Sequence, residues 1–290
     1  MAPKLQEPNW EKDVVYLVQF PRAACIPSIS PFCLKLETWL RMADITYKNA
    51  KTDLMVRSEK GKLPFVELNG KQIADSYFII KELSRHFGKN LENNLTPQER
   101  SLAHSVDRMT EGSLFWVGHE LIVSDPKHLD EMFSDEGVGK HLSGLMKTVQ
   151  PLFKWNMTRR MKQQHDAQGI GKHSHDEVLL MGQDDLIALN SLLEGKKFIA
   201  GDSATSVDAT VFGHVGVMYY MPFDNQLKSF IQSDCSNIVG FLDNIKSTYW
   251  PDWDECISKL SLDTDWKNPK PAPTQEESAA ETATETPTQD

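Results

Sequence analysis

Hydrophobic positions in the first part of the chain switch between strand and helix patterns. The β-branched and aromatic run VVYLVQF (14–20) ends at Pro21 and predicts a strand. The next segment opens at Ser30 with apolar residues at helical spacing. It therefore predicts a helix whose buried face is formed by Phe32, Leu36, Trp39 and Leu40.

A second strand, a hairpin and a second helix are predicted next. ITYKNAK (45–51) is typical of a strand. LPFVELNGKQIAD (63–75) reads as two strands around Asn69-Gly70, the dipeptide that most strongly indicates a hairpin. SYFIIKELSRHF then predicts an amphipathic helix with Asp75 or Ser76 at its N-cap.

The second half shows helical patterns and no comparable pairs of strands. Its first helix begins with a capping-box pattern from Thr96 to Glu99, with Pro97 at the first helical position. Further helices are predicted roughly over 138–164, 175–193, 206–221, and 227–230 continuing into 238–249. Thr205 to Asp208 fits another capping box, which we interpret as structural.

These patterns predict an α+β chain of two domains, a small α/β domain followed by an all-helical one. We place the boundaries at a flexible N-terminus (1–12), the α/β domain (13–88), a polar linker (89–97), the helical domain (98–265) and an acidic tail (266–290).

The formal net charge of −10 argues against a nucleic-acid binder, which is usually basic. Part of this charge lies beyond Pro271, where the ionisable side chains are all acidic: Glu276, Glu277, Glu281, Glu285 and Asp290. With no aromatic residue there, we expect a disordered tail that aids solubility or, alternatively, binds a partner.

Cysteine use and hydropathy favour a cytosolic protein. Four scattered cysteines are too few for a disulfide framework. The first ten residues, MAPKLQEPNW, contain no apolar core of a signal peptide. No run reaches the roughly 18 apolar residues that a membrane span needs. We therefore expect a cytoplasmic chain with no transmembrane segment.

The candidate chemistry begins at Ser30-Pro31-Phe32-Cys33, which is close to a C-P-x-C redox motif with its first thiol replaced by a hydroxyl. Free N–H groups at a helix start stabilise a thiolate, and Ser30 can donate a hydrogen bond to it. The alternative is an ordinary N-cap. Cys33 is either a buried structural thiol or a nucleophile, and Cys25 is a second thiol near the same site.

Four features together resemble the cytosolic glutathione transferase superfamily, with its thioredoxin-like β-α-β-β-β-α domain and its all-helical second domain. They are Ser30 to Cys33 at a helix start, Leu63 to Val66 before a strand, Asp75-Ser76 at the next helix start, and FIAGDSATSVDATVFG (198–213). Within that superfamily, the segments FPRAACIPSISPFCLKLETWLRMADI, GKLPFVELNGKQIADSYFII and AQGIGKHSHDEV resemble the failed axon connections family, a relative of metaxins and of nematode cadmium-responsive proteins.

The resemblance implies a glutathione site. A cis Leu63-Pro64 bond would turn the Leu63 backbone toward the peptide, as when one strand adds to another. Asp75 and Ser76 would hold the γ-glutamyl group at a helix N-terminus, unless they are plain caps. The thiolate would lie at Ser30.

The resemblance also implies a second substrate, a small hydrophobic electrophile. We expect its pocket to involve residues on helices that face the cleft in this fold: Trp116, Trp155, Arg159 and Arg160. The implied activity is conjugation of glutathione in detoxification or stress, with glutathione as co-substrate and no metal. The resemblance also implies a homodimer. The alternative is an interaction protein with weak or no catalysis, acting in axon development.

Two further groups of residues have competing readings. His165, His173 and His175 form a glycine-interrupted cluster that is either a solvated loop or a metal site. Tyr16 resembles the catalytic tyrosine of some transferases, but its place in the middle of a strand favours a position in the core or on the sheet surface.

Overall fold

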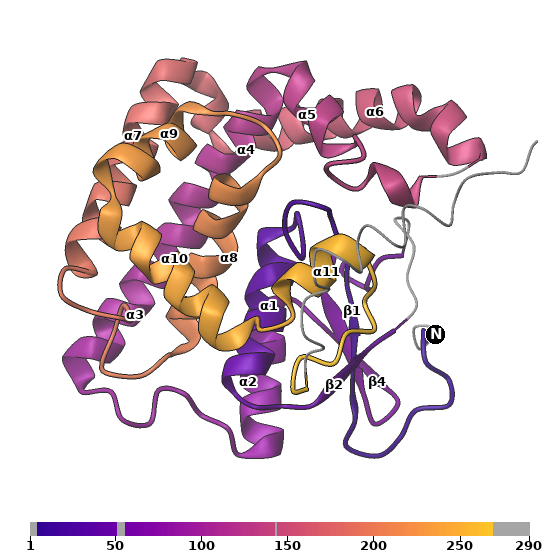
Figure 1. The fold of residues 1–290 in the computed structure, drawn as a ribbon, viewed down its shortest axis with the longest axis vertical. Coiled ribbons are helices and arrows are strands. Elements are labelled where there is room, and N and C mark those ends of the chain that lie inside the picture. The colour runs from indigo at the N-terminus through magenta and orange to yellow at the C-terminus, as the bar shows by residue number, and fades with distance from the viewer. Residues whose placement is uncertain (1–4, 51–55, 143, 269–290) are drawn as a thin grey trace, which may run out of the picture.

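The computed structural model describes residues 5–50, 56–142 and 144–268. A small four-stranded sheet with two helices precedes a larger array of helices (Figure 1). This arrangement confirms the predicted α+β, two-domain architecture. The predicted acidic tail lies outside the described residues from 269 onward.

The sheet has the strand order β2-β1-β3-β4, in which β1 and β2 are parallel and the other neighbours are antiparallel. Its strands are β1 (Val15–Val18), β2 (Tyr47–Asn49), β3 (Phe65–Leu68) and β4 (Lys71–Ala74). Asn69 and Gly70 have φ angles of 51° and 74°, as a two-residue turn between twisted strands requires. The predicted hairpin is therefore confirmed.

Helices α1 (Pro31–Met42) and α2 (Ser76–Phe87) cover one face of this sheet, where they pack on the alternate side chains of the strands. The opposite face carries Glu67, which is buried. Its carboxylate accepts the amides of Gln6 and Glu7 at 2.7 and 2.9 Å. These two hydrogen bonds hold Gln6 and Glu7 against the sheet.

The helical domain begins with α3 (Pro97–Met109), which has the predicted capping box, and continues through a π-turn (Thr110–Leu114) into α4 (Phe115–Ser124). The remaining helices are α5 (Pro126–Met132), α6 (Leu145–Gln168), α7 (His175–Leu192), α8 (Ser206–Tyr220), α9 (Gln226–Asp234), α10 (Ser236–Tyr249) and α11 (Trp253–Lys259). Short 3₁₀ turns cover 139–141 and 170–172.

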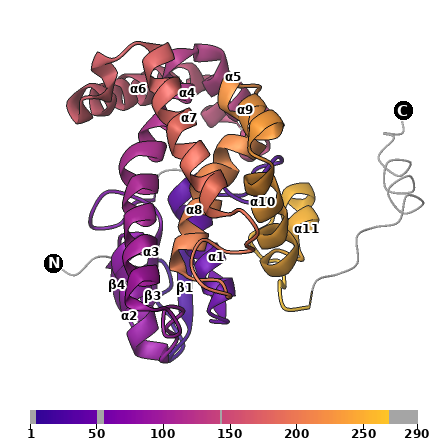
Figure 2. The ribbon, with the colours of Figure 1, turned by 90° about the vertical axis from the view of Figure 1, so that its left-hand side faces the viewer.

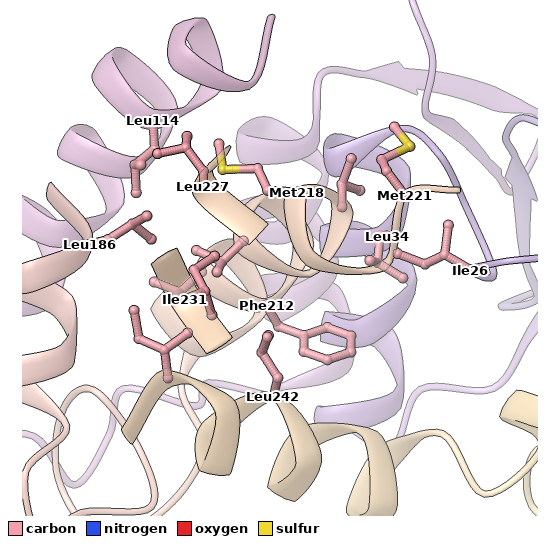
Figure 3. Packing of buried hydrophobic residues seen from close by; sticks show 14 of the residues in the cluster. Ile26, Leu34, Leu114, Leu186, Phe212, Met218, Met221, Leu227, Ile231 and Leu242 are labelled. Carbon is pink, nitrogen blue, oxygen red and sulfur yellow. The ribbon is translucent and has the colours of Figure 1, made fainter. Parts of the chain in front are cut away.

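Helix α8 is the centre of the helical core, and its residues from Val207 to Met218 are all buried. Figure 3 shows Phe212 and Met218 among apolar side chains from several other helices. Gly213 lets α8 approach the start of α1, because a Cβ there would lie 2.6 Å from the Pro31 carbonyl oxygen. This close approach brings the helical core against the first turn of α1.

The end of the described chain returns to the first domain. The Trp266 ring stacks on Tyr47 with centroids 6.3 Å apart, and Asn49 donates to the Leu262 carbonyl at 2.9 Å. The two domains are thus held together by the C-terminal segment as well as by the packing of α1 on α8.

Candidate functional site

Three loops meet at one edge of the sheet because of the strand register. Val18, at the end of β1, pairs with Phe65 at the start of β3, and Phe65 pairs with Ala74 at the end of β4. The loop that leads from β1 to Ser30, the segment before Phe65 and the residues after Ala74 therefore converge. The predicted glutathione-site residues are brought together at this edge.

Ser30 is the N-cap of α1, as predicted. Its hydroxyl oxygen accepts the Cys33 amide at 3.4 Å, and the same hydroxyl can donate one hydrogen bond, either to the Cys33 thiol or to a ligand. Pro31 has no amide hydrogen. Within the described residues, the Phe32 amide forms no hydrogen bond. Ser30 and Phe32 thus offer two donors at the positive end of a helix, an arrangement that favours an anion.

The two nearby cysteines are not activated. Cys33 is fully buried, and this burial raises the pKa of its thiol to about 11 despite hydrogen bonds with Ser30. Burial likewise raises the pKa of Cys25 to about 11. Both thiols are protonated at neutral pH, so the geometry favours a structural role for Cys33 over the nucleophile that the sequence left open.

The Leu63-Pro64 bond is cis, as the resemblance implied. Neither the amide nor the carbonyl of Leu63 has a hydrogen-bond partner among the described residues. Both groups are therefore available to pair with an extended peptide.

Asp75 is the N-cap of α2, and its carboxylate accepts the Tyr77 amide at 3.1 Å. Its φ of 85° is unusual for a residue with a side chain, and such conformations persist where the surrounding structure enforces them, commonly at ligand sites. Ser76 follows at the first helical position and is buried. The pair presents a hydroxyl and helix N-terminal amides to the same edge as Ser30.

An apolar cavity of about 60 Å³ adjoins the start of α1. Ile29 and Pro31, the two neighbours of Ser30, line it. The other walls come from α4, α8 and the loop after α8, and include Phe115, Leu121, Met218 and Phe223. A ligand in this cavity would therefore lie beside the anion-binding end of the helix.

Two buried histidines give this cavity polar groups that the sequence reasoning missed. His214 presents its Nδ1 to the Thr210 carbonyl at 2.8 Å, and its Nε2 has no partner within the described structure. His119 likewise has an unpartnered Nδ1. Burial lowers the pKa of His214 to about 3 and that of His119 to about 4, so both are neutral at pH 7. One sequence signal could have identified these residues: each is a histidine within an apolar helical stretch, and a buried polar side chain is expected to have a hydrogen-bond partner.

The predicted second-substrate residues do not line the cavity. Trp116 is half-buried and packs against the rings of Phe115 and His119, with centroids 5.0 and 5.4 Å away. Trp155 is 60% exposed on α6, with the Arg159 guanidinium 5.8 Å from its ring centroid, and Arg160 is exposed on the same helix. The three α6 residues lie on a part of the helix that is exposed to solvent, away from the cavity walls.

Two histidines of the predicted loop contact one carboxylate, and the third contacts another. His165 is buried, and its Nε2 lies 3.2 Å from the Glu120 carboxylate, which also contacts His175 Nδ1 at 3.0 Å. His173 lies on the surface, 3.8 Å from Glu177. Over the described ranges, no group of three or more histidine, cysteine or acidic side chains is arranged to hold a metal ion.

Two family models match this chain. The model of the glutathione S-transferase N-terminal domain matches residues 31–128, and that of the glutathione S-transferase C-terminal domain matches residues 182–245. Together they cover more than half of the sequence, in the order that the structure shows. The chain belongs to the glutathione S-transferase superfamily. The relatives of this chain include both a named glutathione S-transferase and proteins whose names describe no enzyme.

Failed axon connections of Drosophila melanogaster is 37% identical over 276 residues, which are 91% of this chain and 64% of that protein. The chain thus spans less than two thirds of that relative's length. Isoprene-epoxide–glutathione S-transferase of Rhodococcus sp. (strain AD45) is 27% identical over 77% of this chain and 94% of its own. Human Metaxin-2 is 22% identical over 84% and 91% of the two chains.

Solved structures share the fold. Beta-etherase LigF from Sphingobium sp. strain SYK-6 superposes with a TM-score of 0.54 at 16% identity, covering 85% of this chain and 99% of that one. A glutathione transferase from Pseudomonas putida gives a TM-score of 0.53 at 14% identity, covering 89% and 94%. No helix in the described part of this superfamily member is long and apolar enough to span a bilayer.

Proposed function

We propose that this protein binds glutathione at the sheet edge and transfers its thiolate to a small electrophile in the adjoining cavity. The observation that carries the proposal is the convergence of three elements: the donors of Ser30 and Phe32, the unpaired backbone of Leu63, and the helix start at Asp75-Ser76. Glutathione has a group for each of these elements. Its thiol suits the donors of Ser30 and Phe32, its peptide backbone suits Leu63, and its γ-glutamyl carboxylate suits the helix start at Asp75-Ser76.

In the proposed reaction, glutathione gives up its thiol proton to water and the thiolate accepts hydrogen bonds from Ser30 and Phe32. The helix N-terminus lowers the pKa of such a thiol. The sulfur then forms a bond to carbon as the bond from that carbon to its leaving atom breaks, and the leaving atom keeps that electron pair; an epoxide oxygen released in this way takes a proton from water. The chain contributes stabilisation of the thiolate and orientation of the two reactants. The relative named for an isoprene epoxide supports an electrophile of a few carbon atoms.

A second candidate function is an interaction protein with little catalysis, which would act in axon development. Two observations favour it. The relative with 37% identity is Failed axon connections, and the cavity of about 60 Å³ is smaller than the roughly 150 Å³ cavity that admits benzene in another protein. In this alternative the glutathione site would bind no ligand, or would bind one that only stabilises the fold.

Isothermal titration calorimetry with reduced glutathione tests the proposal. We expect saturable binding in the wild type and an affinity at least about 10-fold lower in Ser76→Ala, which loses a hydrogen bond to a charged group. Ser30→Ala should retain binding within about threefold, but should lower the rate of conjugation to a small epoxide about 10-fold or more, because one donor to the thiolate is lost.

Thr96→Ala is the matched control, since it also removes the hydroxyl of a helix N-cap, at α3. It should leave both binding and turnover unchanged. If the folded wild type produced no heat at about 10 mM glutathione, the enzyme would be ruled out and the interaction protein would be the better account.

We also propose that the protein acts in the cytoplasm as a homodimer. The four cysteines are free thiols, as expected in a reducing compartment. Helices α2, α3 and α7 lie along one face of the molecule (Figure 2), and α2 and α7 each carry exposed large apolar side chains. Such a face favours association with a second copy.

A further inference from the structure

Helix α6 presents an apolar surface to solvent in its first half. Leu152 and Trp155 are 67% and 60% exposed, and Val149 is also exposed. Residues three apart lie on nearly the same side of a helix, so Leu152 and Trp155 form one outward ridge. An exposed tryptophan beside an exposed leucine is unusual on a soluble surface that has no partner.

The second half of the same helix is basic. Helix α6 carries five cations, namely Lys147, Lys154, Arg159, Arg160 and Lys162. Between Leu145 and His165 it has no acidic residue, although the chain as a whole has a net charge of −10. Arg159 follows Trp155 by one turn, on the same outward face. The helix is therefore a local positive region on an acidic protein.

The inner face of α6 packs against other helices of the same molecule. Phe153 and Met157 pack against the helical core, Lys154 pairs with Asp130 of α5, and His165 contacts Glu120 of α4. The helix lies at the periphery of the molecule in both ribbon views (Figures 1 and 2). The outer face is thus exposed and open to a partner. It also lies outside both matched family segments.

We propose that the outer face of α6 binds an anionic lipid surface. A helix that lies in a bilayer interface has leucine and tryptophan on one side and is rich in lysine and arginine. Leu152 and Trp155 would enter the headgroup boundary, where tryptophan is favoured. Arg159, Arg160 and Lys162 would lie against lipid phosphates and carboxylates. The peripheral position of the helix suits a flat surface, and its charge is complementary to that surface.

Each cation near an anionic bilayer contributes enough to change binding by roughly fivefold, and the apolar ridge adds to this. The contact is therefore reversible and sensitive to salt. It would bring the protein to the inner surface of a membrane. This role is independent of glutathione binding at the sheet edge.

Co-sedimentation of the full chain with vesicles tests the proposal. One set contains phosphatidylcholine alone and the other about 30% phosphatidylserine, a fraction chosen to give a strongly negative surface. We expect binding to the anionic vesicles only, with loss at about 0.5 M salt, where charges are screened within a few ångströms. The double change Arg159→Glu with Arg160→Glu should weaken binding at least about 10-fold. Leu152→Ala with Trp155→Ala should also weaken it strongly.

The matched control is Lys196→Glu with Lys197→Glu, an adjacent exposed pair outside α6 that undergoes the same change of charge. It should bind like the wild type. Equal binding by all variants, or no binding by the wild type, would overturn the proposal. A further arm uses a peptide of residues 272–290. If that acidic peptide bound the wild type but not Arg159→Glu/Arg160→Glu, and vesicles did not bind, α6 would be a dock for the chain's own tail and not for lipid.

Discussion

The position of Ser30 depends on a buried charged residue of the same helix, Glu37. Its carboxylate is fully buried on α1 and accepts hydrogen bonds from Arg22 at 2.6 and 2.7 Å and from the Tyr47 hydroxyl at 2.7 Å. Arg41 lies 3.5 Å away and pairs mainly with Asp252. This cluster joins the loop before Ser30 to the C-terminal segment, so it sets the position of the candidate site.

We expect Glu37→Gln to lower the free energy of unfolding by about 3–5 kcal/mol, because it leaves two guanidinium groups buried with less compensation. Urea denaturation at pH 7 measures this loss. The control is Glu11→Gln at the exposed Glu11–Lys48 pair, where no measurable loss is expected. A similar loss in both variants would contradict the role of burial.

The same residue predicts a dependence of stability on pH. Burial would raise the pKa of Glu37, but the charges and hydrogen bonds of Arg22 and Arg41 outweigh it and lower the pKa to about 2. An unfolded glutamate has a pKa of about 4.3. The stabilisation by Glu37 is therefore complete above about pH 4.3 and is lost as the pH falls toward 2. Denaturation curves collected from pH 7 to pH 2.5 should show this loss in the wild type and a weaker one in Glu37→Gln.

At the scale of elements, the start of α8 is held by Asp208. This buried carboxylate accepts the amides of Ile199 and Thr205 at 2.7 and 2.8 Å and the Thr205 hydroxyl at 2.8 Å. Asp208→Ala would leave these donors buried without partners, so we expect a loss of about 3–5 kcal/mol in the free energy of unfolding. Thermal and urea unfolding check it.

Glu177→Ala is the comparison, because it breaks the same kind of capping box at the solvent-exposed start of α7. Its effect should be much smaller than that of Asp208→Ala. Comparable losses would mean that the capping pattern, and not the burial of its carboxylate, controls stability.

The elements that the sequence predicted well are those with local signals. Each of these elements is determined by residues within four positions of each other, so the local sequence is enough to predict it. They are the hairpin at Asn69-Gly70 and the helix starts at Ser30, Thr96 and Thr205. The start of α6 was predicted too early, at 138 instead of Leu145. There the backbone turns tightly, and a Cβ on Gly139 would lie 2.5 Å from the Ser134 carbonyl oxygen.

The candidate site was predictable only in its N-terminal half. Ser30, Leu63, Asp75 and Ser76 lie in one small domain whose strand order follows from a recognisable pattern. The cavity depends instead on helices from distant parts of the chain, where the rings of Phe32 and His214 meet with centroids 5.0 Å apart. Periodicity shows that a residue lies on a helix, but it does not show which neighbour each face of that helix meets.

At the scale of the whole molecule, the face formed by α2, α3 and α7 is distinct from the outer face of α6. On α2, Phe78 is 55% exposed beside Tyr77, and on α7 Leu180 and Ile187 are 59% and 50% exposed. A two-fold axis near α3 would bring the α2 of one copy toward the same face of the other. Two such apolar ridges, covered together, would remove a large apolar area from water.

We therefore expect a mass of twice 32.9 kDa in light scattering at micromolar concentration. Phe78→Glu should raise the dimer dissociation constant about 30-fold or more, since it places a charge on the apolar part of the contact. Leu152→Glu, at an equally exposed apolar residue of α6, should leave the mass unchanged and should abolish vesicle binding instead. Because each variant affects one association and spares the other, the pair separates self-association from lipid binding. A monomeric wild type would remove the dimer and leave the exposed face of α2 and α7 to another partner.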